Sequence, residues 1–429
     1  MNEWRGKNIK ILKKFFSASN YLFLFVSIIS LFNVFLLSLP LTKYLGYEYS
    51  VLNSIFIVLI SGIYTIVLLN NSSAEKFDIK EVSTKFITSH LIFVLVPIII
   101  SLFGLFRIVT CPFIDGIKFY TVLTLPAPII GISLGLISFN ASRKFKFPIF
   151  FGLLIVICSI PVLEIYFNPQ IYFYNPLVGF FPGTIYDEAI EIDAKLIVYR
   201  LINIFYFGLL IYLLLQFLSR RSKYSIKTIM LVAVVLPLIL VLISPYLGYS
   251  TTKSRIKKVL DKTLVSQHFN IHYASGIEDS LIKTIALHHE YSYAELRKYF
   301  NETPKGKITS YIFNSREEKG ELFGSSNADV AKPWLSEIYI TLDNYDKTLK
   351  HEIAHCFAGE FGSTIFNVAD NFNPSLIEGI AMAADPIHDD FDLDYMAALA
   401  FNHGYKIDIK KLFKSFDFFL HPSSLGYII

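Results

Sequence analysis

Seven runs of mostly apolar residues, each long enough to cross a lipid bilayer, occupy the first 250 residues of this 429-residue chain. A membrane-spanning helix needs about 20 such residues, because the hydrocarbon core of a bilayer is about 30 Å thick. This pattern predicts a multi-pass α-helical membrane bundle and excludes a disordered or collagen-like chain. The expected spans are residues 19–40, 51–70, 86–106, 119–139, 147–166, 197–218 and 228–246.

The density of charged residues changes sharply after residue 250. Residues 1–250 carry 31 charged side chains, or 12%, whereas residues 251–429 carry 43, or 24%. The second value is close to the roughly 25% of soluble globular proteins. We therefore expect a transmembrane helical domain of about seven spans at 1–250 and a folded extracytoplasmic domain at 251–429. The net charge of +4 is too small and too scattered to indicate a nucleic-acid partner.

The lysines and arginines between the spans predict the orientation, because short cytoplasmic loops carry an excess of them. Fifteen lie in the N-terminal tail and in the second, fourth and sixth connections, and four lie in the other connections. This asymmetry predicts a multi-pass cell-membrane protein with a cytoplasmic N-terminus and residues 251–429 outside. A basic cluster at 253–258 opposes this orientation, but large domains translocate largely regardless of local charge.

The long outer connection at 167–196 is aromatic and proline-rich, and its second half is acidic. Two interpretations are open: an aromatic belt at the membrane surface followed by a solvated loop, or a docking surface for the outer domain or its substrate. Arg200 and Glu164 lie near the outer ends of their spans, where snorkelling toward the interface accounts for both. No span carries the chain of acidic residues that proton-coupled transporters use.

The second part of the chain mixes strand and helix patterns. Segments 270–275, 307–313 and 336–342 alternate as strands do, and 279–300 and 345–358 have helical periodicity. The order strand, helix, strand, strand, helix indicates an α/β or α+β domain. We expect the third strand to lie at the edge of the sheet, where an extended peptide can bind through backbone hydrogen bonds.

The second expected helix contains the sequence HEIAH, an HExxH motif, at residues 351–355. His351 and His355 share one helix face, so that both imidazoles can reach a single Zn²⁺. Glu352 lies one step round the helix and can reach a metal-bound water without ligating the metal. A third protein ligand is required, because catalytic zinc keeps its fourth position for water.

A second helix, expected at 374–385, offers this third ligand. Its sequence PSLIEGIAMAAD begins with helix-start residues and contains Glu378. Glu378 follows His355 by 23 positions, which is enough for a loop and a returning helix. The small residues Gly379 and Ala381 allow this helix to approach the first one closely.

The two segments HEIAH and LIEGIA together resemble those of the gluzincin metallopeptidases, specifically the peptidase MA-like domains. The resemblance covers roughly 268–385 and implies an α+β zincin-like fold. It also implies that His351, His355 and Glu378 bind zinc and that Glu352 is the catalytic general base. One departure is the stretch before Glu378, which lacks the aromatic residue usual in this family. The other is the ending SSLGYII, which is compatible with a domain truncated at its C-terminus.

Other polar residues near the motif have alternative interpretations. Asp385 either accepts a hydrogen bond from a ligating histidine or is a solvated residue at the helix end, the second being favoured. We expect His288 and His289 to form a surface pair and Cys356 to pack as a small apolar residue. The acidic run at 388–394 is expected to be a solvated loop, with a calcium site as the alternative. Four residues are candidate donors to a reaction oxyanion: Tyr395, His403, Tyr405 and Tyr427.

The sequence thus predicts a membrane-anchored zinc metallopeptidase that hydrolyses a peptide or protein substrate on the outer face of the membrane. The alternative is a non-catalytic sensor or transport-associated protein whose outer domain binds a ligand or peptide. A protease active inside the bilayer is disfavoured, because the sequence around HEIAH is polar and lacks a 20-residue apolar run. The substrate and the oligomeric state have no signature in the sequence.

Overall fold

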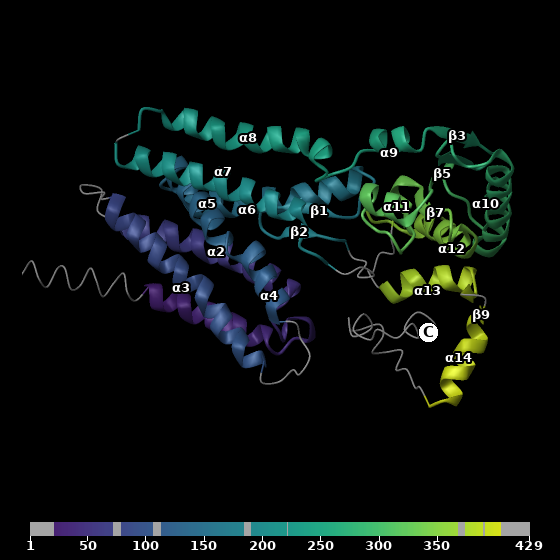
Figure 1. Ribbon diagram of the computed structural model, residues 1–429, viewed down its shortest axis with the longest axis horizontal. Helices are drawn as coiled ribbons and strands as arrows, with labels where there is room; N and C mark the ends of the chain where they lie inside the picture. Colours follow the sequence, from purple (N-terminus) through teal and green to yellow (C-terminus); the bar gives the residue numbers. More distant parts are fainter. Residues whose placement is uncertain are drawn as a thin grey trace, which may run out of the picture. The chain divides into compact units, whose positions relative to one another are not determined.

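The computed structural model describes residues 21–71, 79–105, 113–183, 190–220, 222–367, 374–388 and 391–404. The chain divides into two compact units (Figure 1). The first unit comprises Met1–Ile165, Tyr172–Phe181 and Ile190–Ser250. The second comprises Tyr166–Ile171, Pro182–Ala189 and Thr251–Ile429.

The first unit is built from apolar helices joined by short connections (Figure 1). The first described helix is Tyr21–Leu36. Before α5, the short helix α4 (Phe113–Phe119) continues into a π-helical turn, η2 (Tyr120–Thr124). A small hairpin of β1 (Phe173–Asn175) and β2 (Gly179–Phe181) precedes α7. The longer helices are α2 (Tyr47–Asn71), α3 (Ile79–Leu105), α5 (Ala127–Ala141), α6 (Lys146–Phe167), α7 (Ala194–Leu218) and α8 (Ile226–Leu247).

Within the described residues, six helical stretches are long and apolar enough to cross a membrane, and they coincide with the last six expected spans. The stretch Phe113–Ala141 combines α4, η2 and α5. The helix Tyr21–Leu36 matches the first expected span but is shorter than a full span within the described residues. Many large apolar side chains on α6 and α8 are exposed, as lipid contact requires. The first unit is therefore a helical region of membrane-protein type.

Glycines bring α2 and α5 unusually close together. A Cβ atom added to Gly131 would lie 2.5 Å from the carbonyl oxygen of Val58, and one added to Gly135 would lie 2.7 Å from that of Gly62. Side chains at these positions would therefore force the two backbones apart. Small residues at such crossings are the usual packing device of membrane helices, because lipid gives apolar helices no hydrophobic reason to associate.

Arg200, on α7, is buried rather than snorkelling as the sequence suggested, with only 2% of its surface exposed. Its Nε donates to the carbonyl oxygen of Val122 at 3.0 Å, and Nη1 donates to that of Pro176 at 2.6 Å. Nη2 donates to Leu123 O and to Ser54 Oγ. The guanidinium therefore holds the π-helical turn and the β1–β2 hairpin onto α7, and backbone carbonyls replace the water it would otherwise seek.

The second unit contains a five-stranded mixed sheet with the order β3-β4-β5-β7-β6. The middle strands β4 (Phe269–Tyr273), β5 (Ile308–Phe313) and β7 (Glu337–Thr341) are parallel. The outer strands β3 (Lys262–Val265) and β6 (Val330–Lys332) run antiparallel to their neighbours. The three predicted strands are confirmed as β4, β5 and β7. The predicted edge strand is wrong, because β6 pairs with β7 and occupies that edge.

Helices cover both faces of this sheet, and the period of two along each strand decides which side chains face which layer. Alternate residues such as Ile308, Ile312 and Ile340 share a core with α10 (Asp279–Phe300) and α12 (Tyr345–Ala358), and α13 (Pro374–Ala384) packs on α12. The residues between them, such as Tyr311 and Tyr339, pack against α9 (Lys253–Val259) and α11 (Arg316–Leu322) on the other face. The helices expected at 279–300 and 345–358 are confirmed as α10 and α12. The second unit is thus an α+β domain of three layers (Figure 1).

The segment Tyr166–Ile171 packs within the second unit. The Lys332 ammonium of β6 donates to the carbonyl oxygens of Asn168 at 2.9 Å and Gln170 at 2.8 Å. The indole of Trp334 donates to the carbonyl oxygen of Tyr166 at 2.9 Å. The start of the 167–196 connection therefore belongs to the second unit, whereas the β1–β2 hairpin belongs to the first.

The buried position of Arg200 predicts that Arg200→Met destabilises the first unit. Three carbonyl groups would lose their donor, at a cost of about 1–3 kcal/mol for each buried group left unsatisfied. We expect a loss of about 3 kcal/mol or more and a clearly lower melting temperature of the full-length protein in detergent. Lys195→Met, an exposed cation on the same helix, is the control and should melt as the wild type does. Equal melting temperatures for both variants would contradict this role of Arg200.

Candidate metal centre

Helix α12 presents the HExxH motif because its apolar residues face the sheet. Leu349, Ile353 and Phe357 lie in the core of the second unit. His351 and His355 therefore fall on the side away from the sheet, where their side chains keep 18% and 11% of their surface exposed. The motif histidines are thus accessible from outside while the helix that carries them is firmly packed.

Helix α13 packs against α12 through small side chains. Ala381 and Ala384 are buried in the same core as the apolar residues of α12. Because alanine is small, the two helices approach closely, and Glu378, one turn before Ala381, reaches toward the motif. The helix predicted at 374–385 is confirmed, with the bounds Pro374–Ala384.

The structure brings His351, His355 and Glu378 together. The Nε2 atoms of the two histidines are 3.1 Å apart. One carboxylate oxygen of Glu378, Oε2, lies 3.3 Å from His351 Nε2 and 3.7 Å from His355 Nε2. Among the described residues this is a group of three side chains whose ligand atoms are close enough to share one metal ion.

These distances can be compared with those of a tetrahedral zinc site. With Zn–N and Zn–O bonds of about 2.0–2.2 Å, tetrahedral ligand atoms are separated by about 3.3–3.6 Å. The three observed separations, from 3.1 to 3.7 Å, lie around this range. Two imidazoles and one carboxylate also form a ligand set known from catalytic zinc sites. The spacing of the three donor atoms is therefore compatible with one tetrahedrally coordinated metal ion.

Electrostatics distinguish the two glutamates of the site. Burial raises the pKa of Glu352 to about 8, and the neighbouring His351 partly opposes this rise. Glu378 behaves in the opposite way: burial alone would raise its pKa, but the neighbouring imidazoles of His351 and His355 hold the pKa well below the usual range. The two carboxyl groups therefore have different surroundings: that of Glu352 is buried, and that of Glu378 faces two imidazoles.

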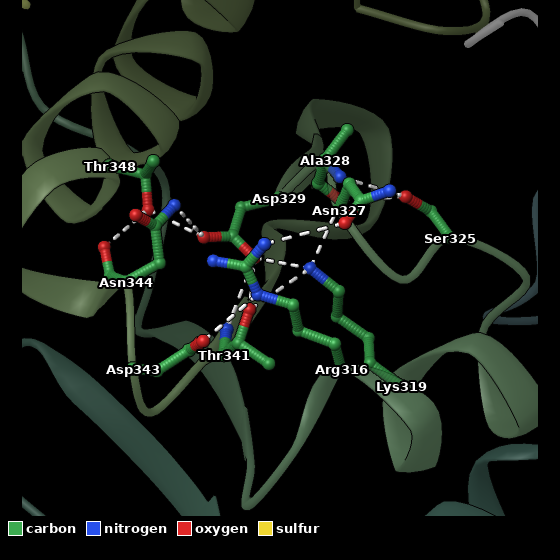
Figure 2. A network of polar contacts seen from close by, with 10 residues as sticks. All are labelled: Arg316, Lys319, Ser325, Asn327, Ala328, Asp329, Thr341, Asp343, Asn344 and Thr348. Atoms are coloured by element: carbon green, nitrogen blue, oxygen red, sulfur yellow. Dashed lines mark hydrogen bonds and ion pairs between the residues drawn. The ribbon is translucent and has the colours of Figure 1, made fainter. Parts of the chain in front are cut away.

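A buried polar network lies at the start of α12, and the sequence analysis missed it (Figure 2). The Lys319 ammonium pairs with the Asp329 carboxylate, and both side chains are fully buried. Asp329 also accepts hydrogen bonds from Thr348 Oγ1 at 2.6 Å and from Asn344 Nδ2 at 3.3 Å. In the sequence this network shows only as a single aspartate before a three-residue strand. Many surface loops contain such an aspartate.

Asp385 is not the solvated helix-end residue that the sequence analysis favoured. Its side chain is 15% exposed, and one carboxylate oxygen lies 4.0 Å from the Lys350 ammonium. Burial raises the pKa of Asp385, while Lys350 and His351 oppose the rise. Asp385 therefore lies against Lys350, at the partly buried end of α13.

Two of the four candidate oxyanion donors, Tyr395 and His403, lie within the described residues. Tyr395 is exposed, and His403 Nδ1 contacts the carbonyl oxygen of Leu399 on its own helix, α14 (Leu393–Asn402). Tyr405 and Tyr427 lie outside the described residues. The same holds for part of the acidic run at 388–394, so that its two interpretations remain open.

The expected surface pair of histidines is half wrong. His288 is exposed, but His289 is fully buried between α10 and β5. Its Nδ1 contacts the Ile285 carbonyl oxygen at 2.8 Å, and its Nε2 contacts Ser310 Oγ at 2.9 Å. Both ring nitrogens are therefore used in structural hydrogen bonds. Cys356 is buried in the core, as predicted.

The burial of His289 predicts a pH dependence of stability. Burial lowers the pKa of His289 to about 4, against 6.5 for a free histidine. The unfolded chain therefore binds the proton more readily, and the unfolding free energy falls as the pH drops from about 6.5 to about 4. For one group this amounts to about 3 kcal/mol. We expect His289→Gln to reduce the dependence of the unfolding free energy on pH over this range, as measured by denaturant unfolding at several pH values. His288→Gln should leave this dependence unchanged. An equal pH dependence for the two variants would refute the prediction.

No family model matches this chain, and neither does any curated protein or solved structure. The likeness to gluzincins therefore rests on the HEIAH and LIEGIA segments. The geometry adds that the three side chains these segments supply converge on one point.

Proposed function

We propose that this chain is a membrane-anchored, zinc-dependent metallopeptidase that hydrolyses peptide bonds of a peptide or protein substrate. The observation that supports it most is the convergence of His351, His355 and Glu378, whose ligand atoms lie 3.1–3.7 Å apart. A loop and a returning helix separate Glu378 from the histidine pair in sequence, so that helix periodicity alone does not account for their meeting. In this proposal the three residues hold Zn²⁺.

Zinc bound at such a site acidifies a water molecule and polarises a carbonyl group. Glu352 is the general base of the proposed reaction. It accepts the proton of the attacking water and delivers it to the nitrogen of the leaving amine, which balances the hydrolysis of one amide bond. Because Glu352 follows His351 directly, its carboxyl group lies beside the ligands without being one of them. Its burial limits competing contact with bulk water.

The proposal places the second unit outside the cell membrane. The apolar helices of the first unit support membrane embedding. The fifteen-to-four distribution of lysine and arginine residues supports a cytoplasmic N-terminus. An odd number of spans then carries residues 251–429 to the outer face. The helix Tyr21–Leu36 has to serve as the additional span in this arrangement.

The metal content of the purified full-length protein tests the site. We expect about one zinc ion per chain for the wild type, as tetrahedral sites of this ligand set bind. His351→Ala and Glu378→Ala should lose most of it, because each removes one of three protein ligands. His288→Ala, which removes an exposed histidine of the same domain, is the control and should keep the metal.

Glu352→Gln separates catalysis from binding. The amide cannot accept the proton of the water, so that hydrolysis of a peptide library should fall by about 10²–10⁴-fold while zinc is retained. If the wild type and Glu352→Gln both bind zinc and neither cleaves any peptide, the enzyme proposal fails. The alternative of a sensor or transport-associated protein with a ligand-binding outer domain would then take its place.

Protease protection in oriented membrane vesicles tests the topology. Protease added to the outer side of intact cells or right-side-out vesicles should release fragments of residues 251–429. The positive-inside distribution predicts this result. Inverted vesicles should protect the same residues until detergent is added. Digestion of this region only from the cytoplasmic side would refute the proposed orientation.

A further inference from the structure

The Lys319–Asp329 ion pair is fully buried, which sets it apart from the exposed or half-exposed pairs of the second unit. Removing two charges from water is costly, so that such a pair adds little to stability by itself. The best-attested use of buried charged groups is to specify one arrangement of the elements around them. The contacts of this pair show which elements those are.

The Asp329 carboxylate connects residues of four secondary-structure elements (Figure 2). Its Oδ1 atom accepts from the Lys319 ammonium of α11 and from the backbone N–H of Thr341 at the end of β7, the latter at 3.1 Å. Its Oδ2 atom accepts from Asn344 Nδ2, directly before α12, and from Thr348 Oγ1 in the first turn of that helix. Asp329 itself directly precedes β6. The carboxylate therefore joins two strands and α11 to the beginning of α12, where the helix dipole favours a negative charge.

The position of this contact along α12 relates it to the candidate metal centre. Thr348 precedes Glu352 by four residues, so that both lie on one helix face, and it precedes His351 by three. The pair therefore lies one helical turn from the motif, on its buried side.

We propose that Asp329, held in place by Lys319, is a positioning residue of the metal centre. By fixing the first turn of α12 through Thr348, it sets the rotation of the helix that points His351 and His355 at Glu378. This inference rests on the proposed zinc function. It assigns a role to residues on α11 and before β6 that do not touch the metal ligands themselves.

The experiment measures zinc affinity of the full-length protein in detergent, by competition with a chromogenic chelator. Thr348→Val keeps the shape of the side chain but removes the hydroxyl that donates to Asp329. We expect it to weaken zinc binding by about 10-fold or more, the usual effect of losing a contact that orients metal ligands. Thr348→Ser retains the hydroxyl and should bind within about twofold of the wild type on the same basis. Asp329→Asn should weaken binding at least as much as Thr348→Val.

Asp343→Asn is the matched control. Asp343 lies in the same β7–α12 connection, and its carboxylate pairs with Arg316 at the surface, with both side chains about half exposed. Its amide variant should keep wild-type zinc affinity. The visible absorption of the Co²⁺-substituted protein provides a second readout, since a rotated histidine pair changes the ligand field. We expect an altered spectrum for Thr348→Val and a wild-type spectrum for Thr348→Ser.

The outcomes separate this inference from the function on which it rests. If Thr348→Val and Asp329→Asn unfold cooperatively and bind zinc as tightly as the wild type, the positioning role is overturned while the zinc site stands. If Asp329→Asn does not fold, Thr348→Val and Thr348→Ser decide the question. A wild-type protein that binds no zinc overturns the proposed function and this inference together. Zinc binding without peptide hydrolysis overturns only the catalytic proposal, and the affinity comparison still tests Asp329.

Discussion

The contact between α12 and α13 brings the three candidate metal ligands together. HExxH on one helix supplies two imidazoles, but two ligands do not make a catalytic zinc site. The third side chain, Glu378, lies near the histidines because the small residues Ala381 and Ala384 allow α13 to pack closely on α12. Glu378 then places a carboxylate oxygen 3.3 Å from His351 and 3.7 Å from His355. Larger residues at the two alanine positions would push that oxygen away from both histidines.

Both units contain buried charged side chains, and these are stabilised in two different ways. In the helical region, Arg200 gives its donors to carbonyl oxygens freed by a π-helical turn and a hairpin. In the α+β domain, Lys319 pairs with Asp329, which in turn accepts from the first turn of α12. In each case the charge holds irregular backbone against a regular helix. Such groups cost desolvation energy but leave few alternative arrangements open.

The candidate metal ligands could be identified from the sequence because their signal is local. His351 and His355 lie four residues apart, which places them on one helix face in any protein. For Glu378 the sequence signal is a short second motif together with neighbouring small residues. Asp329 could not be found in this way, because it acts through Thr348, Asn344 and Thr341, which approach it only after the sheet has formed. The same reason explains why His289, expected at the surface, is buried: its partner Ser310 belongs to the next strand.

The apolar helices, the main strands and the HExxH motif can be read from single segments, because they follow from periodicity and residue type along a continuous stretch of chain. The packing of α13 on α12, and the position of the three-residue strand β6 rather than β7 at the edge of the sheet, depend on the assembled fold. So does the burial of Arg200 and of the Lys319–Asp329 pair. These features depend on which groups from distant segments form hydrogen bonds, ion pairs and packing contacts with one another. No local pattern encodes the partner of a buried charge.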